Sequence, residues 1–278
     1  MESIAESESV LEQKLSKKRI AYLESRAQEM EDSIRYAGNL QKSILPHPNL
    51  FRDSFSDAFV LYQPKDIVGG DFYWIATFGD DIYFAVGDCK GHGVPGALVN
   101  IAGNSILRQL INRQGLTEPG DILAELDKEL IGLFNDHKTN GQTYDGMDVV
   151  LCKFNLKTNT ACYCGAGRPL LRLRNGKLTE FKKGTASIGF NIGRDKQFKT
   201  ECVDLRPGDQ FYLFSDGYTD QFGGEKIKKF NRKRFRNLLG SIEEMDMTRQ
   251  QKELEFTLQN WMGNHEQIND VCVLGIKI

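Results

Sequence analysis

The first forty-five residues show a helical pattern of apolar and polar positions. From residue 20 onward, apolar side chains recur at alternating spacings of three and four, and Gln41 is the one polar member of the series. The apolar members are Ile20, Leu23, Ala27, Met30, Ile34, Ala37 and Ile44. Glycine is absent before Gly38, and charged residues occupy the other faces. The pattern predicts a long helix with a narrow apolar stripe, ended by Pro46 and Pro48.

The stripe has two interpretations. A heptad-like seam of this length suits pairing with a second copy of the same helix, which is the arrangement we favour. The alternative is a helix that packs back on its own domain, and the small residues Ala27 and Ala37 leave it open. The sequence therefore divides into a regulatory or dimerisation helix over residues 1–46 and a domain over 47–278.

The pattern after Pro46 changes to short apolar runs separated by turns. Strands are predicted at 58–63, 82–88, 147–155, 160–164, 170–174, 177–181, 209–215 and 271–278, with helices at 94–113, 121–134, 232–239 and 248–262. Asn175-Gly176 is a strong hairpin signal, and 137–146 reads as a polar loop. Because hairpins outnumber strand-helix-strand units, we expect an α+β fold with antiparallel sheets covered by helices.

Composition narrows the function classes. The chain has 278 residues, of which 40% are apolar, so it can bury a sizeable core. A net charge of −2 gives no general attraction to nucleic acid, and the basic stretch 226–234 is interpreted as a solvated surface. No apolar run approaches the length of a membrane span, and no signal segment is evident. The six cysteines lie in apolar segments and are expected to be reduced, buried thiols of a cytoplasmic protein.

Three aspartates carry the candidate chemistry. Asp71, Asp88 and Asp216 each lie beside glycine at the end of a strand-like run. Any one of them could be a turn residue or a helix cap. Asp71 and Asp88 are expected at opposite ends of one hairpin or of two adjacent strands, with Lys65 and Lys90 as the only cations nearby in sequence. Buried carboxylates without cationic partners are costly, so the set predicts a site for divalent cations.

A second chemistry is suggested by the spacing from Cys162 to Arg168. Five residues separate the two, as in cysteine-dependent tyrosine phosphatases, where a thiolate attacks phosphorus. Cys162 lies in an alternating strand, however, and Pro169 opens a further strand rather than a helix. We therefore interpret the spacing as chance.

A family resemblance rests on an ordered set of motifs over residue 41 to the C-terminus. The motifs are Gln41-Lys42-Ser43-Ile44-Leu45-Pro46, Pro64-Lys65-Asp66-Ile67-Val68-Gly69-Gly70-Asp71-Phe72-Tyr73, Gly87-Asp88-Cys89-Lys90-Gly91-His92-Gly93, Gly165-Ala166-Gly167, Phe214-Ser215-Asp216-Gly217 and Asn269-Asp270-Val271. The set resembles the SpoIIE/RsbU branch of the metal-dependent PP2C-type protein phosphatases. The resemblance implies two antiparallel sheets flanked by helices, two Mn²⁺ or Mg²⁺ ions, and dephosphorylation of serine or threonine on a partner protein. In bacterial relatives that partner is typically a STAS protein, and the preceding helix relays regulation.

The resemblance assigns residues to the metal centre. Asp88 would bridge both ions together with the backbone carbonyl of Cys89, while Asp71 and Asp216 would bind from other loops. One position departs from the family pattern, because Asn269 stands where an acidic ligand is usual. An uncharged ligand predicts weaker metal affinity, and Asp270 is the alternative ligand. Loss of turnover, leaving a phosphoprotein-binding domain, is the alternative function.

His92 is a further candidate within the Gly91-His92-Gly93 segment. It could act as a general acid, or its imidazole could only fix the loop by hydrogen bonding. The residues leave both roles open.

Overall fold

The computed structural model describes residues 2–112, 115–135, 146–182, 184–189 and 196–278, with side chains described from residue 14 onward. The predicted polar loop at 137–146 falls outside these residues except for Gly146. In the described part of the chain, no helix has the length and apolar character needed to cross a membrane.

Two five-stranded sheets form the centre of the fold. The first sheet has the order β1 (Asp57–Gln63), β12 (Val271–Lys277), β9 (Gln210–Phe214), β6 (Leu170–Arg174) and β7 (Lys177–Phe181). The second has the order β2 (Asp71–Phe78), β3 (Asp81–Cys89), β4 (Met147–Asn155), β5 (Thr160–Ala166) and β8 (Glu201–Asp204). Neighbouring strands pair antiparallel in both sheets. The predicted antiparallel sandwich is confirmed.

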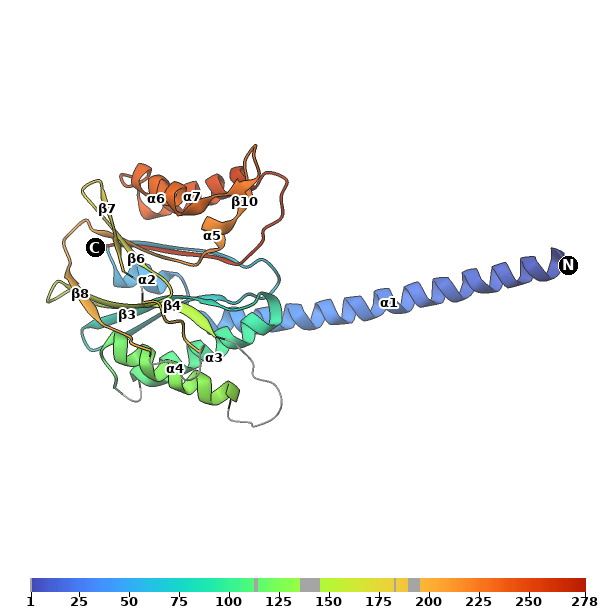
Figure 1. Cartoon of the computed structure of the whole chain (residues 1–278), viewed down its shortest axis with the longest axis horizontal. Helices are drawn as coiled ribbons and strands as arrows, with labels where there is room; N and C mark the ends of the chain where they lie inside the picture. The colour runs from blue at the N-terminus through green and yellow to red at the C-terminus, as the bar shows by residue number, and fades with distance from the viewer. Residues whose placement is uncertain (1, 113–114, 136–145, 183, 190–195) are drawn as a thin grey trace.

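Helices cover the outer faces of the two sheets (Figure 1). Helices α3 (Gly93–Asn112) and α4 (Pro119–Asn135) pack on the second sheet, and α6 (Asn231–Ser241) and α7 (Met247–Met262) pack on the first. Between the sheets, the centre of the Phe154 ring lies 4.8 Å from the ring centre of Phe84 and 4.9 Å from that of Phe211. Both faces of the central strands are thus buried, which explains why these strands read as continuous apolar runs.

Several short elements were not predicted from the sequence. These are α2 (Asn49–Ser54), α5 (Gly217–Asp220), the edge strand β8, and the two-residue strands β10 (Phe222–Gly223) and β11 (Lys228–Lys229). Strand β2 was expected only as a neighbour of the strand at 82–88, and no range was predicted for it. The exposed residues of β8 give no alternating apolar signal, which is why it escaped prediction.

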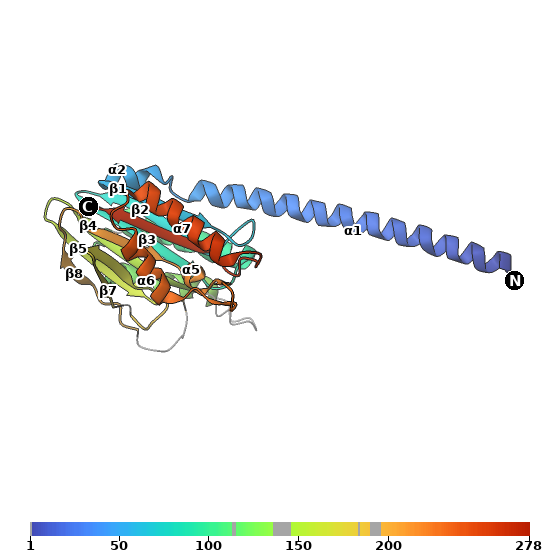
Figure 2. The ribbon, with the colours of Figure 1, turned by 90° about the horizontal axis from the view of Figure 1, so that it is seen from above.

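The long helix α1 (Glu2–Ile44) projects from the domain (Figures 1 and 2). It ends at Ile44, just ahead of Pro46, in agreement with the end predicted from the prolines. The first members of its stripe are exposed, at 52% for Ile20, 56% for Leu23 and 62% for Met30, and Ala27 is exposed as well.

The last members of the stripe behave differently. Ile34, Ala37 and Ile44 are partly buried, and Gln41 is buried. The C-terminal part of the stripe therefore lies against the chain's own domain, as in the alternative interpretation, and only the part before Ile34 is free to meet another molecule.

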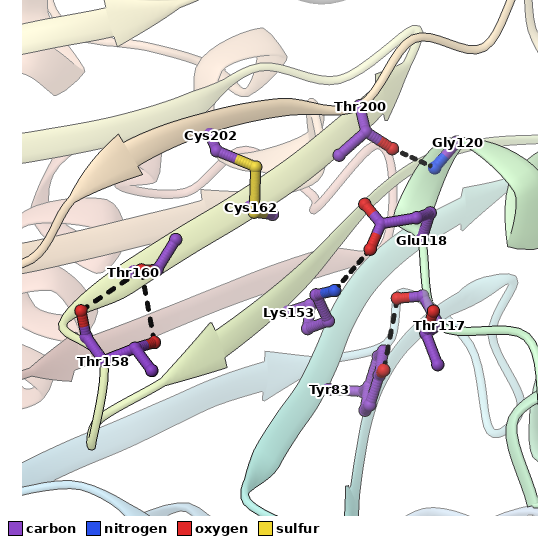
Figure 3. Close-up of a disulfide and its surroundings, with 10 residues drawn as sticks. All are labelled: Tyr83, Thr117, Glu118, Gly120, Lys153, Thr158, Thr160, Cys162, Thr200 and Cys202. Atoms are coloured by element: carbon purple, nitrogen blue, oxygen red, sulfur yellow. Dashed lines mark hydrogen bonds and ion pairs between the residues drawn. A yellow bond between two sulfur atoms is a disulfide. The ribbon is translucent and has the colours of Figure 1, made fainter.

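One cysteine prediction is wrong. Cys162 and Cys202 form a disulfide between β5 and β8 (Figure 3). The antiparallel register places these two residues directly opposite each other, which the sequence could not reveal across 40 residues. The remaining cysteines, Cys89, Cys152, Cys164 and Cys272, are buried free thiols as expected.

Candidate metal centre

Three neighbouring strands of the second sheet carry aspartates that lie side by side at the same end of the sheet. Asp71 begins β2, and its Cα partner across the ladder is Asp88 on β3. Asp88 is in turn paired with Asp148 on β4. The hairpin prediction was correct, but the expectation of opposite ends was wrong, because the start of one strand and the end of the next meet at the open end of a hairpin.

Asp216 reaches the same place from the other sheet. It follows β9 and precedes the short helix α5. Its backbone N–H lies 3.5 Å from Oδ2 of Asp88. The three predicted aspartates and Asp148 are therefore gathered from both sheets of the sandwich. Sequence reasoning missed Asp148, although it too stands near glycine at a strand end.

Arg168 lies in the middle of this group. Its Nη2 donates to Oδ2 of Asp88 and, at 2.8 Å, to Oδ2 of Asp216. Its Nε lies 3.7 Å from Oδ2 of Asp148. The side chain is only 6% exposed. Sequence reasoning noticed Arg168 only through its spacing from Cys162, and the structure instead pairs that cysteine with Cys202.

Burial and neighbouring charges shift the pKa values of these carboxyl groups in different directions. Burial raises the pKa of Asp88 to about 7, although Arg168 opposes the shift. Burial, followed by the charge of Asp88, raises the pKa of Asp71 well above its ordinary value. Burial also disfavours the ionised form of Asp216, but Arg168 outweighs it and lowers the pKa of that carboxyl. The site thus needs more positive charge than one guanidinium supplies.

The donor atoms suit hard divalent cations. Oδ2 of Asp71 is buried with no hydrogen-bond partner among the described residues. A Cβ at Gly70 would lie 2.9 Å from the carbonyl oxygen of Cys89 and 2.8 Å from that of Gly91, so only glycine leaves these oxygens accessible. Carboxylate and carbonyl oxygens are the ligands that Mg²⁺ and Mn²⁺ prefer. The types of donor atom therefore fit the metal that the resemblance implies.

The positions of the described side chains in this structure do not yet form a metal site. Among the described residues, no three acidic, histidine or cysteine side chains are arranged to hold a metal ion. Arg168 contacts both Asp88 and Asp216, so these two carboxylates converge on its guanidinium.

Asn269 and Asp270 point to different places. Nδ2 of Asn269 donates to Oδ1 of Asp216 at 2.9 Å, so Asn269 faces the carboxylate group. Asp270 is buried, and its two oxygens accept from the backbone N–H groups of Lys65 at 2.7 Å and Gly70 at 2.6 Å. Asp270 thus holds the loop that precedes Asp71.

Two helices support the same loop. The Gln41 side chain on α1 donates to the carbonyl of Gly69 at 2.6 Å and accepts from its N–H at 3.1 Å. Asn100 on α3 donates to the carbonyl of Asp71 at 2.8 Å. The end of the long helix is therefore bonded two residues from a candidate metal ligand.

His92 is an exposed side chain paired with Asp66. Its side chain is 56% exposed, and Nδ1 lies 3.0 Å from Oδ2 of Asp66. The flanking glycines have φ values of +85° at Gly91 and +67° at Gly93, which other residues rarely adopt. This is the geometry expected of the loop-fixing role.

Comparisons with known proteins place this chain in a family. The family model of Stage II sporulation protein E (SpoIIE) matches residues 79–278, so the chain belongs to the SpoIIE family. Solved relatives whose names include a PP2C domain share its fold. The SiaA-PP2C domain of Pseudomonas aeruginosa is 30% identical, with a TM-score of 0.81 over 90% of this chain and 98% of that one.

Two further relatives are more distant. The PP2C phosphatase domain of SpoIIE from Bacillus subtilis, solved with a fragment of its regulatory domain, shares the fold with a TM-score of 0.65 at 17% identity, over 80% of this chain and 61% of that one. Phosphoserine phosphatase RsbU of Bacillus subtilis is 23% identical over 196 residues, which are 69% of this chain. The chain spans 55% of the length of RsbU.

Proposed function

We propose that this chain is a metal-dependent phosphatase that removes phosphate from phosphoserine or phosphothreonine of a partner protein. The observation that carries the proposal is the meeting of Asp71, Asp88 and Asp216 from both sheets around one buried charge. Membership of the SpoIIE family supports it.

Each proposed ligand has a distinct position. Asp88 stands between Asp71 and Asp148 in the sheet and contacts the N–H of Asp216, which suits a bridging carboxylate. Asp71, Asp216 and the carbonyl of Cys89 would complete two sites for Mn²⁺ or Mg²⁺. Two such cations, when bound, would supply the charge that activates water and neutralises phosphoryl oxygens. The overall hydrolysis forms a bond from the water oxygen to phosphorus and breaks the P–O bond to serine, and a proton from water ends on the serine oxygen, which leaves as the alcohol.

The proposed partner is a STAS-type regulator phosphorylated on serine, as in a bacterial signalling pathway. The test compares phosphate release from such a protein, from a phosphoserine peptide and from a phosphotyrosine peptide, each with Mn²⁺ and with or without iodoacetamide. We expect release from the two phosphoserine substrates, faster from the STAS protein, and no effect of the alkylating agent. Preference for phosphotyrosine together with loss of activity on alkylation would instead support thiolate chemistry at a cysteine.

A binding-only domain is the second candidate function. It is favoured by Asn269, whose amide donates to Asp216 where the family pattern has an acidic ligand. Such a domain would bind a phosphoprotein without turnover.

The exposed part of the α1 stripe supports a homodimer. Ile20, Leu23, Ala27 and Met30 stand free of the domain on one face of the projecting helix. A second copy of this segment would cover them. Since Gln41 on the same helix bonds to Gly69, pairing could bias the loop that carries Asp71.

We expect Leu23→Asp to convert the dimer to a monomer in sedimentation velocity and to change the specific activity. A charge buried in the seam opposes pairing. Tyr22→Asp is the matched control, because it adds the same charge at an exposed neighbour outside the stripe and should leave both properties as they are. A wild-type chain that sediments as a monomer would refute the dimer.

A further inference from the structure

Arg168 is a buried cation at the point where the candidate metal ligands converge. Its guanidinium contacts Asp88 and Asp216 and approaches Asp148, which are contributed by three different strand ends. Its Nε is buried and has no hydrogen-bond partner among the described residues. Nε therefore contributes no hydrogen bond to the described part of the chain that would hold the side chain in place.

The contacts of Arg168 and those of a cation at the same carboxylates exclude each other. The oxygen Oδ2 of Asp88 and the oxygen Oδ2 of Asp216 both accept from Nη2 of Arg168. A divalent cation held by those oxygens would lie within a few ångströms of the guanidinium, and two positive charges at that distance repel strongly in a buried site. One must leave when the other binds.

We propose that Arg168 is a built-in counter-ion that competes with the metal ions for Asp88 and Asp216, so that metal binding requires its guanidinium to move off these carboxylates. This inference rests on the proposed function. The competition sets the metal concentration at which the site fills, and it keeps the carboxylates neutralised when metal is scarce.

The position of Arg168 in the chain confines the proposed movement to its side chain. Arg168 lies between β5 and β6, directly after Gly167, whose φ is +78°. Only its side chain needs to swing, because the backbone on either side belongs to the two sheets. Asp148 is a partner that can retain it, since Nε already lies 3.7 Å from Oδ2 of that residue.

The test is calorimetric titration of the full chain with Mn²⁺, compared between wild type and Arg168→Met. Removal of the competing charge should tighten Mn²⁺ binding by about tenfold to a hundredfold, the range expected for a charged hydrogen bond. Arg168→Lys, which keeps the charge but lacks the Nε that approaches Asp148 and the planar guanidinium, should fall between them. Arg172→Met is the matched control on β6, since Arg172 pairs with Asp204 instead, and its affinity should equal that of wild type.

A second readout separates competition from a purely structural role. In chelator, Arg168→Met should lower the melting temperature by about 3–10 °C, the shift that corresponds to the same tenfold to hundredfold change, because the carboxylates lose their counter-ion. With saturating Mn²⁺ the difference from wild type should disappear. An equal loss of stability in both conditions, or unchanged affinity in a variant that folds, would overturn the competition while leaving the metal site intact. A wild-type chain that binds no Mn²⁺ would instead overturn the proposed function.

Discussion

Asp88→Asn is expected to reduce phosphate release by at least about three orders of magnitude while leaving the fold intact. Asp88 is the ligand proposed to bridge both cations, so its loss removes the activation of water and the neutralisation of the phosphoryl group together. The fold should tolerate the change, because Asn has nearly the same shape as Asp and burial already disfavours the charged carboxylate, raising its pKa to about 7.

The measurement is the initial rate with a phosphoserine peptide at saturating Mn²⁺, with melting temperature recorded in chelator. Asp81→Asn is the matched control, since Asp81 lies at the opposite end of the same strand and accepts from Asn155. It should keep the wild-type rate. A folded Asp88→Asn protein with more than about a tenth of wild-type activity would show that hydrolysis does not depend on this ligand.

Asn269→Asp is expected to lower the half-saturating Mn²⁺ concentration by about tenfold, because metal affinity rises with the number of charged ligands. Asn269 already faces Asp216, with its Nδ2 2.9 Å from Oδ1 of that residue. A carboxylate in the same place would add a charged oxygen to the site. In chelator the variant should be less stable than wild type, since two carboxylates would then be adjacent without a cation.

The control substitution is Asn155→Asp. Asn155 also donates to an aspartate, Asp81, at 2.7 Å, but at the far end of the β3–β4 pair. It should leave the metal requirement unchanged. If Asn269→Asp titrated with Mn²⁺ like wild type, the departure from the family pattern would have no bearing on metal binding, and a one-residue shift to Asp270 would need to be considered again.

The sequence predicted the parts of this fold that depend on local patterns. The hairpin at Asn175-Gly176 and the end of α1 before Pro46 follow from turn and proline chemistry, which act within a few residues. The three aspartates could be found because glycine marked each of them at a strand end.

The remaining features depend on contacts between distant segments. Asp148 belongs to the site because the β3–β4 register pairs it with Asp88, and Arg168 belongs to it because its buried side chain contacts Asp88 from the segment after β5. The stripe of α1 has one periodicity, yet its two ends have different surroundings, and periodicity alone does not say which surface a helix meets. The same limit applies to Cys162 and Cys202, which only sheet register brings together.

The most direct test of the central claim is phosphate release from a phosphoserine peptide across a Mn²⁺ titration, with a chelated control. The proposed centre predicts a rate that is absent in chelator, rises with Mn²⁺ and saturates, with a high half-saturating concentration because Asn269 is uncharged. Activity that persists in chelator would contradict the role assigned to Asp71, Asp88 and Asp216. No activity at any Mn²⁺ or Mg²⁺ concentration, in a protein that still binds phosphoprotein, would establish the binding-only function instead.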